Sequence, residues 1–362
     1  MKNSIVRAAG LQIRNQRIRD AVLNGVPKTG PPTLRSRWAR SRYVSPEGIN
    51  EAFSLAKEIV DKEAANHKSA AGEVEKELKS ATGEEQRAEL AKNLEHHLVK
   101  SEFHNPEVRF NFMVKDSVDL NEPIYRYLSR TEWAAKEMLI LMQRLEQHHV
   151  IPDTMPTLDP RAQVDVQFVT PTMSSFEPGS FLSNEVCERR PRISIQEFEP
   201  IAKDSLYSVV IVNPDVPDLE NDSFKTLLHY AAVNIRISND APEVDFAQAT
   251  ELADYLPPHP EKNAPAQRFC VWVFRQPARV EGAEISREGF DIRQFAGANN
   301  LEAVGAHMWR VRYDLTTDFI RAKYGLGPGS VYFRARTAKP EEALLHVRHR
   351  QKWEKFVETP SK

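Results

Sequence analysis

Apolar positions are sparse in the N-terminal third of the chain. Residues 47–103 are rich in Ala, Glu, Lys and Leu, which predicts one or two long, mostly exposed helices. Gly72 and the pair Thr82-Gly83 interrupt this composition, so we expect the helix to break near these points. Residues 106–119 follow and are predicted to form a short extended piece.

A stronger helical pattern occupies residues 122–147. Apolar side chains recur there at steps of three and four, which is the repeat of an amphipathic helix. The stripe consists of Ile124, Leu128, Ala135, Met138, Leu141, Met142 and Leu145. We expect this helix to dock on the domain that follows it.

Beyond residue 150 the pattern changes to short β-prone runs separated by prolines. The runs are VDVQF (164–168), RISI (192–195), LYSVVIV (206–212), HYAAVNIRI (229–237) and FCVWVF (269–274). They predict a mainly β fold with added helices, namely an antiparallel β-sandwich preceded by a long, largely helical N-terminal extension. Helical composition returns at 285–300 and 314–325. The absence of βαβ alternation and of a glycine-rich phosphate loop excludes Rossmann and P-loop folds.

The net charge of -2 hides a strong asymmetry. Residues 1–44 contain ten Lys or Arg and a single acid, Asp20, so the remainder of the chain is acidic. A basic arm on an acidic body is typical of proteins that contact nucleic acid or an anionic membrane surface, or that carry an import signal. No stretch approaches the roughly 20 apolar residues that a membrane span needs.

The first 24 residues have the composition of a mitochondrial presequence. They are arginine-rich and amphipathic, and they contain no acid before Asp20. We therefore expect the protein in the mitochondrial matrix. An ordinary basic surface helix is the alternative, and removal or retention of the segment stays open.

A second basic segment, residues 27–43, combines prolines, arginines and aromatic residues. Its prolines and its lack of periodicity argue against an independent fold. Arginines pair with phosphates and aromatic rings stack on unpaired bases, so this segment and the basic tail 346–355 are predicted to contact RNA. The predicted contacts are Arg35, Arg37, Trp38, Arg40, Arg42, Arg348, Arg350 and Lys352. A basic linker that binds nothing specific is the alternative.

The cysteines and histidines do not form a metal-binding pattern. Cys187 and Cys270 are far apart in the sequence, and the histidine pairs 96–97 and 148–149 lack the i, i+4 spacing of a helical metal site. No Gly-x-Ser-x-Gly motif surrounds a serine, which argues against a hydrolase. We therefore expect no metal, no cofactor and no enzymatic activity.

One loop and one strand bring candidate chemistry into the β-rich part. Asp215 lies in the stiff sequence Asn-Pro-Asp-Val-Pro, and His229 follows in a later strand. We predict that Asp215 accepts a hydrogen bond from the His229 imidazole at a pocket. A core histidine satisfied by other neighbours is the alternative. Strand alternation puts His229 on one apolar face together with Ala231, Val233, Ile235 and Ile237.

Four blocks of this region resemble the phosphatidylethanolamine-binding protein family and follow that family's order. They are HVIPDTMPTLDPRAQVDVQF (149–168), YSVVIVNPDVP (207–217), LHYAAVNI (228–235) and YLPPHPEKNAPAQRFCVWVF (255–274). A weaker fifth block, 290–314, resembles the closing helix and strand of the family. The resemblance covers residues 149–325 and implies a small pocket that accepts phosphate-like head groups.

The resemblance also shows how the pocket has changed in this chain. Asp215 and His229 match an aspartate and a histidine that line the family's pocket. Asn213, Leu228 and Gln267 stand where the family has its other turn aspartate, a first histidine and a later histidine. These replacements remove charge and imply a degenerate pocket. Its candidate residues are Asp215, His229, Gln267, Arg268 and Trp272.

The degenerate pocket and the basic extensions together resemble mitochondrial large-subunit ribosomal proteins that carry a domain of this family. The resemblance implies a structural role at the central protuberance of the mitochondrial ribosome. Ribosomal RNA and neighbouring ribosomal proteins would be the partners, with no small-molecule substrate. The alternative is a soluble regulator that binds an anion or a phospholipid head group, which predicts an intact pocket and short termini. The predicted domains are a basic arm (1–44), a helical extension (45–148), a β-sandwich (149–325) and a basic tail (326–362).

Overall fold

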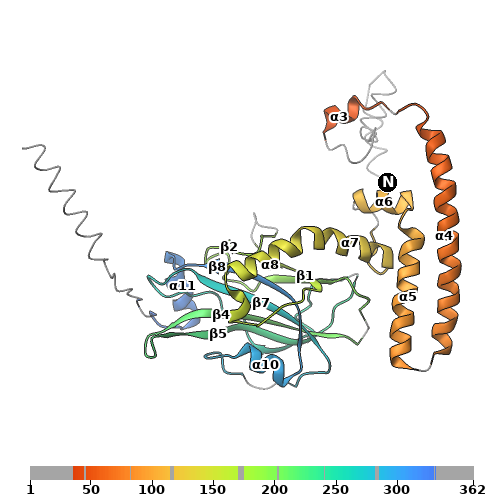
Figure 1. Cartoon of the computed structure of the whole chain (residues 1–362). Helices are drawn as coiled ribbons and strands as arrows, with labels where there is room; N and C mark the ends of the chain where they lie inside the picture. The colour runs from red at the N-terminus through yellow and green to blue at the C-terminus, as the bar shows by residue number, and fades with distance from the viewer. Residues whose placement is uncertain are drawn as a thin grey trace, which may run out of the picture. The chain divides into compact units, whose positions relative to one another are not determined.

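The computed structural model describes most of the chain between residues 36 and 331 (Figure 1). The described ranges are 36–44, 46–81, 83–114, 118–169, 175–201, 204–239, 241–281, 285–329 and 331. Residues 1–24 and the predicted RNA contacts Arg35, Arg348, Arg350 and Lys352 lie outside these ranges. The described chain divides into two compact units. The first ends at Lys136 and also contains Phe198–Pro200, and the second contains the other described residues.

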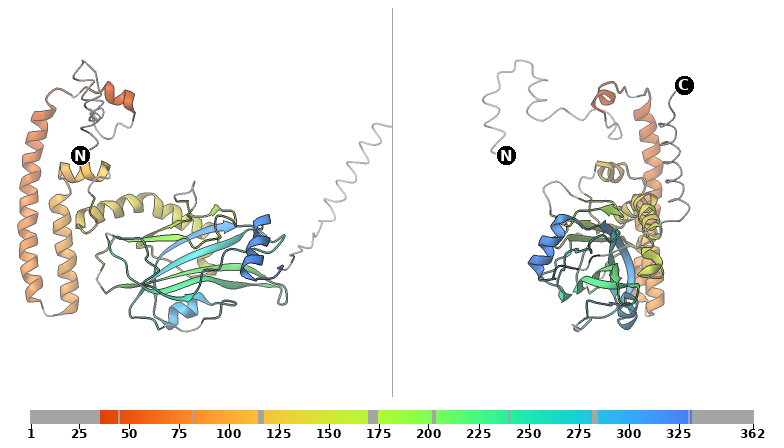
Figure 2. Two further views of the ribbon diagram at one scale, coloured as in Figure 1. Left: turned by 180° about the vertical axis from the view of Figure 1, so that it is seen from behind. Right: turned by 90° about the vertical axis from the view of Figure 1, so that its left-hand side faces the viewer.

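The first unit is helical. Its long helices α4 and α5 form an antiparallel hairpin (Figure 2). The break between Ser80 and Glu84 confirms the predicted interruption at Thr82-Gly83, whereas α4 continues through Gly72. A glycine costs a helix only about 1 kcal/mol, which the good helix formers around Gly72 outweigh. The helices of this unit are α3 (Arg37–Ser41), α4 (Ile49–Ser80), α5 (Glu84–Glu102), α6 (Pro106–Val114) and α7 (Pro123–Ala135).

Helix α6 corrects the prediction of an extended piece at 106–119. The side-chain oxygen of Asn105 accepts a hydrogen bond from the backbone N–H of Glu107 at 3.0 Å, and Pro106 begins the helix. Asn as the capping residue followed by Pro at the first helical position is a favourable helix start. The sequence Asn105-Pro106-Glu107 therefore contains the helix-start signal.

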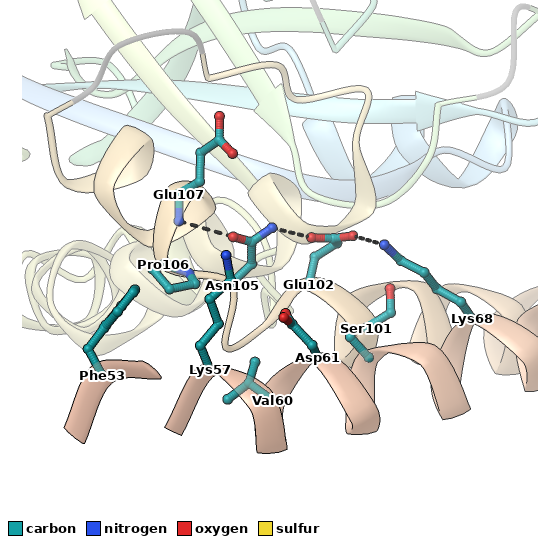
Figure 3. Close-up of a pocket in the computed structure, with 11 residues that line it drawn as sticks. Phe53, Lys57, Val60, Asp61, Lys68, Ser101, Glu102, Asn105, Pro106 and Glu107 are labelled. Carbon is teal, nitrogen blue, oxygen red and sulfur yellow. Dashed lines mark hydrogen bonds and ion pairs between the residues drawn. The ribbon is translucent and has the colours of Figure 1, made fainter. Parts of the chain in front are cut away.

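A hollow of about 330 Å³ lies where the turn between α5 and α6 meets α4 (Figure 3). Lys68 pairs there with Glu102 at 2.7 Å, and Glu102 accepts a hydrogen bond from Asn105 at 2.7 Å. An ion pair as exposed as this one contributes about 0–1 kcal/mol. Apolar packing therefore supplies most of the stabilisation of this unit, through the buried residues Val99, Val108, Ile124, Tyr125 and Leu128.

The second unit contains the β-sheets and confirms the predicted sandwich. A six-stranded sheet has the order β2-β8-β7-β4-β5-β6, and a two-stranded sheet pairs β1 with β3. β2 runs parallel to β8, and the other strand pairs of the described chain are antiparallel. The strands are β1 (Ala162–Gln167), β2 (Ser180–Phe181), β3 (Arg192–Glu197), β4 (Leu206–Asp218), β5 (Ser223–Ile235), β6 (Thr250–Ala253), β7 (Gln267–Gln276) and β8 (Glu302–Val311).

The large sheet is buried on both faces, which explains its nearly continuous apolar runs. Along β4, Val209 and Ile211 point to one face while Val210 and Val212 point to the other. The first face packs on β1 and β3, and helices α8 and α10 cover the second (Figure 1). The helices of this unit are α8 (Glu137–Gln147), α9 (Val150–Asp153), α10 (Ile292–Ala298) and α11 (Leu315–Tyr324).

The amphipathic stripe predicted at 122–147 forms two helices instead of one. Lys136 separates α7 from α8 because its backbone angles, φ -137° and ψ -64°, are not helical. Leu141 and Leu145 of α8 are buried in the core of the second unit, so docking on the β domain is confirmed for α8. The predicted boundary at 148/149 places α8 with the helical extension, whereas its packing joins it to the sandwich.

No helix in the described part of the chain is long and apolar enough to cross a membrane. α4 is the longest of these helices with 32 residues, and charged side chains recur along its whole length. α8 carries more apolar residues but has only 11, which is about half of what a span requires.

Candidate functional site

The pocket expected from the family resemblance is present as a very small cavity. Its volume of about 20 Å³ leaves room for a single water molecule. Three of its lining residues are Asn213 of β4, His229 of β5 and Gln267 at the start of β7. The remaining lining residues are Val216, Leu227, His259 and Glu261.

Asn213 and Gln267 place two neutral amides at this cavity, where the family resemblance implies an aspartate and a histidine. The Nδ2 amide of Asn213 donates a hydrogen bond to Oε1 of Gln267 at 2.8 Å, and both residues are buried. The Oδ1 atom of Asn213 accepts a hydrogen bond from the backbone N–H of Asp215 at 2.9 Å. The two amides therefore satisfy each other across the cavity and leave no charge on this wall.

A β-bulge determines where His229 points. Leu228 pairs with Val212 and Tyr230 pairs with Ile211, so His229 is the extra residue between two consecutive positions of β4. The bulge breaks the alternation on which the predicted face was built, and that prediction is wrong. Ala231 and Val233 lie on the face covered by helices, whereas the His229 ring packs on Phe269 of the opposite face. A second irregularity at Asn234, where φ is 60°, places Ile235 and Ile237 on that opposite face as well.

His229 is a neutral core histidine. Its Nδ1–H donates to the carbonyl oxygen of Leu256 at 2.7 Å, and its ring packs edge-on against Phe269. Burial, together with the smaller effect of the neighbouring His259, lowers the pKa of His229 to about 3. The predicted hydrogen bond to Asp215 is wrong, because Nδ1 of the imidazole donates to a backbone carbonyl and Asp215 pairs with another residue.

Asp215 forms a bidentate ion pair with Arg268 instead. The two guanidinium contacts measure 2.5 Å for Nη2 to Oδ1 and 2.8 Å for Nε to Oδ2. The Nη1 atom of Arg268 also donates to Asp153 at 2.8 Å and to the carbonyl oxygen of His148 at 2.7 Å. Burial opposes the charge of Arg268, but the hydrogen bonds and charges of its carboxylate partners raise its pKa overall. Arg268 is thus already neutralised and ties the start of β7 to the α8–α9 turn.

Trp272 does not line the cavity. It is fully buried among the residues between the large sheet and helices α8 and α10. Its indole N–H donates to Oγ1 of Thr154 at 3.0 Å, and Thr154 donates to the carbonyl oxygen of Val150. The structure therefore gathers His229 and Gln267 at the cavity, pairs Asp215 with Arg268, and places Trp272 in a core.

The sequence patterns missed three residues near the cavity. Arg321 of α11 is buried, and its Nη2 atom pairs with Glu261 and donates to the carbonyl oxygen of His259, both at 2.8 Å. Burial lowers the pKa of His259, and the positive charge of Arg321 acts in the same direction. No local motif marks these residues, because they are brought together from two distant segments.

Acidification is expected to destabilise the second unit through its buried histidines. Burial lowers the pKa of His229 to about 3 and that of His307 to about 4, from an ordinary value of 6.5. Below pH 6.5 the histidines of the unfolded chain bind protons, whereas those of the folded protein stay neutral. The contribution of these histidines to the free energy of unfolding is therefore fully present above pH 6.5 and is lost as the pH falls toward the folded-state pKa values. The expected loss is about 2 kcal/mol per histidine between pH 6.5 and about 5.

Urea unfolding of the parent protein and of His229→Gln at about pH 7.5 and about pH 5 tests this expectation. The variant should lose about 2 kcal/mol of the pH dependence, because glutamine does not titrate. An unchanged pH dependence in the variant would show that His229 is protonated as easily in the folded protein as in the unfolded chain.

Part of the predicted basic arm forms a short helix. Arg37, Trp38 and Arg40 lie in α3, although residues 27–43 were not expected to fold independently. The ring of Trp38 is 63% exposed, and the guanidinium carbon of Arg42 lies 3.9 Å from its centroid. This arrangement keeps one aromatic face and one cation together on the surface. RNA contact by these residues stays a prediction.

The described residues offer neither a metal site nor an activated thiol. No group of three His, Cys, Asp or Glu side chains among them is placed to hold a metal ion. Cys187 and Cys270 are buried, and burial raises the pKa of both thiols. A thiol of this kind is inert as a nucleophile.

Comparison with known proteins connects this geometry to a family. The model of the phosphatidylethanolamine-binding protein family matches residues 172–311. The large ribosomal subunit protein mL38 of Schizosaccharomyces pombe is 31% identical over 232 residues, which span 63% of this chain and 74% of that protein. The chain belongs to the mL38 family of large ribosomal subunit proteins. Membership in the mL38 family confirms the resemblance to a large-subunit ribosomal protein with a phosphatidylethanolamine-binding-like domain.

Other relatives match shorter parts of the chain. The protein MOTHER of FT and TFL1 homolog 2 of Oryza sativa is 29% identical over 124 residues, or 32% of this mL38-family chain and 66% of that protein. The solved phosphatidylethanolamine-binding protein from Plasmodium vivax is 17% identical and covers 48% of this chain and 97% of its own, with a TM-score of 0.38.

Proposed function

We propose that this protein is a structural component of the large subunit of the mitochondrial ribosome. In this proposal the β domain docks on ribosomal RNA and neighbouring ribosomal proteins at the central protuberance. The observation that carries it is the 31% identity to an mL38 protein over 74% of that protein's length. The identity extends over 232 residues, which is more than the β domain holds, so it includes part of the chain outside the sandwich.

The state of the pocket supports a structural role. A phosphate-like head group needs a cavity several times larger than 20 Å³, and it needs donors that are not already engaged. Asn213 and Gln267 bond to each other, and Arg268 is neutralised by Asp215 and Asp153. The alternative of a soluble regulator that binds anions or head groups therefore receives no support from this geometry.

The basic N-terminal segment supports mitochondrial import and RNA contact. Ten Lys or Arg precede residue 45 with a single acid, which fits a matrix-targeted, RNA-binding arm. Trp38 and Arg42 offer a ring and a guanidinium on the surface of the described part of this arm. We infer that the arm extends along ribosomal RNA while the β domain acts as a rigid docking block.

Charge reversal in the arm tests the proposal. Changing Arg35, Arg37, Arg40 and Arg42 to glutamate is expected to reduce the amount of the protein in purified large subunits at least about tenfold. Phosphate contacts supply much of the affinity for RNA, and each reversal adds repulsion. Quantitative mass spectrometry of the subunits measures the effect, with the unmodified protein expected at one copy per subunit.

A charge-preserving variant is the matched control. Replacing the same four arginines by lysine keeps the positive charge and should retain most of the protein in the subunit. Thermal unfolding of both variants should match that of the parent, because α3 is not part of the sandwich. Normal incorporation of the glutamate variant would show that the arm is not part of the proposed interface.

A further inference from the structure

A group of unpaired arginines lies at one end of the sandwich. Arg144 of α8, Arg310 of β8 and Arg312 just after it have no carboxylate partner among the described residues. Other arginines of the described chain do have such partners, for example Arg126 with Glu95 and Arg161 with Glu302. The three cations form one cluster, because the charges of Arg144 and Arg312 both act on Arg310.

Arg310 is held in a fixed position by the β2–β8 pairing. Phe181 is its register partner in β2, and the guanidinium carbon of Arg310 lies 3.9 Å from the centroid of that ring. The Nε–H of Arg310 donates to the carbonyl oxygen of Gly179 at 2.9 Å. Its two terminal nitrogens have no acceptor among the described residues. The guanidinium therefore presents a preorganised pair of donors, and Arg312 lies beside the same ring at 5.2 Å.

The positive charges at this end of the sheet repel one another. Burial lowers the pKa of Arg310, and the charges of Arg144 and Arg312 lower it further. Burial also lowers the pKa of His148, followed by the charges of Arg310 and Arg144. Such a cluster is unfavourable by itself and becomes favourable when an anion lies between the cations.

A groove adjoins the arginines and adds an aromatic surface. Its volume is about 420 Å³, and Arg310, His148 and Phe224 are among its lining residues. Phe224 of β5 is 58% exposed, so its ring is available to a ligand. The two carboxylates of the groove, Asp153 and Asp215, are both paired with Arg268 and oppose an anion only weakly.

We propose that this surface, made of Arg144, Phe224, Arg310 and Arg312, binds single-stranded RNA. The guanidinium groups contact phosphates, and the ring of Phe224 stacks on an unpaired base in the groove. A free anion needs the cations but no exposed ring, whereas RNA uses both. This inference deepens the proposed function by naming an RNA site on the β domain, separate from the basic arm.

Binding of a labelled oligouridylate of about ten nucleotides to the full-length protein tests the inference. Fluorescence anisotropy at about 50 and about 200 mM KCl gives the affinity and its dependence on salt. The R310E/R312E variant should bind about tenfold more weakly at the lower salt concentration. Its logarithmic salt slope should fall by about 1.4, since each phosphate contact on a single strand contributes about 0.7.

The R236E/R279E variant is the matched control. Arg236 and Arg279 are exposed and lie beside Asn234, at the far end of β5 from Phe224. The change in net charge is the same, so affinity within about twofold of the parent separates a local site from a general charge effect. R310Q/R312Q, which adds no acid, serves if the glutamate variant does not fold, and about threefold weaker binding is then expected.

Phe224→Ala distinguishes RNA from other anions. Loss of stacking should weaken oligouridylate binding about tenfold and leave the binding of inorganic polyphosphate unchanged. The inference is overturned if R310E/R312E binds the oligouridylate as tightly as R236E/R279E does. It is also overturned if R310E/R312E binds the oligouridylate normally but is no longer incorporated into the ribosomal subunit, because the surface then docks a protein. Failure of the unmodified protein to associate with the subunit would contradict the proposed function and leave the RNA titration to decide this site by itself.

Discussion

Replacing Arg268 by methionine is expected to lower the free energy of unfolding of the β-sandwich unit by about 3–5 kcal/mol. The substitution leaves Asp215, whose side chain is 20% exposed, without its bidentate partner. It also removes donors from Asp153 and from the carbonyl oxygen of His148, which connect β7 to the α8–α9 turn. Methionine keeps much of the side-chain length, so the loss reports on polar contacts. Urea unfolding followed by the fluorescence of the buried tryptophans measures the loss.

Two further variants separate the contributions within this network. Asp153→Asn should cost less than about 1 kcal/mol, because Asp153 is 45% exposed and water replaces its partner. The double variant R268M/D215N should be more stable than R268M, since the less exposed of the two carboxylates, Asp215, is no longer left as an unpaired charge. A cost below about 1 kcal/mol for R268M would show that Arg268 is free to bind an external anion, which would revive the head-group hypothesis.

Trp272→Ala is expected to cost about 3–5 kcal/mol of folding free energy. The indole is fully buried and stacks near Phe274, so its removal leaves a large cavity between the sheet and helices α8 and α10. Thr154 also loses the donor that reaches its hydroxyl oxygen. Thermal unfolding followed by far-ultraviolet circular dichroism measures the change without depending on the tryptophan itself.

Trp272→Phe is the control for the size of the side chain. It retains most of the apolar surface and should cost about 1–2 kcal/mol, mainly for the lost hydrogen bond and the remaining gap. The family resemblance implies that Trp272 is a pocket residue, and that role predicts a different pattern. Nearly normal stability of Trp272→Ala, together with altered ligand binding, would contradict the core assignment.

Much of the β domain follows from its sequence, because its strands are long, apolar and bounded by proline. Each predicted run overlaps an observed strand, and the pairing of β4 with β5 and β7 places them at the centre of the sheet. The shorter β2 and β6 carry too few residues to give a periodic signal. β2 nevertheless matters, since Phe181 positions Arg310 from it.

The errors at the candidate site have a common physical cause. Strand alternation assigned His229 to the wrong neighbours, because the bulge opposite Ile211 and Val212 shifts its side chain. Sequence spacing suggests that Asp215 pairs with His229. The planar guanidinium of Arg268 instead donates two parallel hydrogen bonds to the Asp215 carboxylate. Bulge positions and hydrogen-bond partners depend on which residues are close in three dimensions, and the periodicity of the sequence does not reveal them.

The sedimentation of a tagged copy of the protein from a mitochondrial lysate, at low and at high salt, tests the central claim most directly. A structural component of the large subunit is predicted to migrate with that subunit, and to stay with it at salt concentrations that remove loosely bound RNA-binding proteins. Migration as a free protein at low salt would contradict the account.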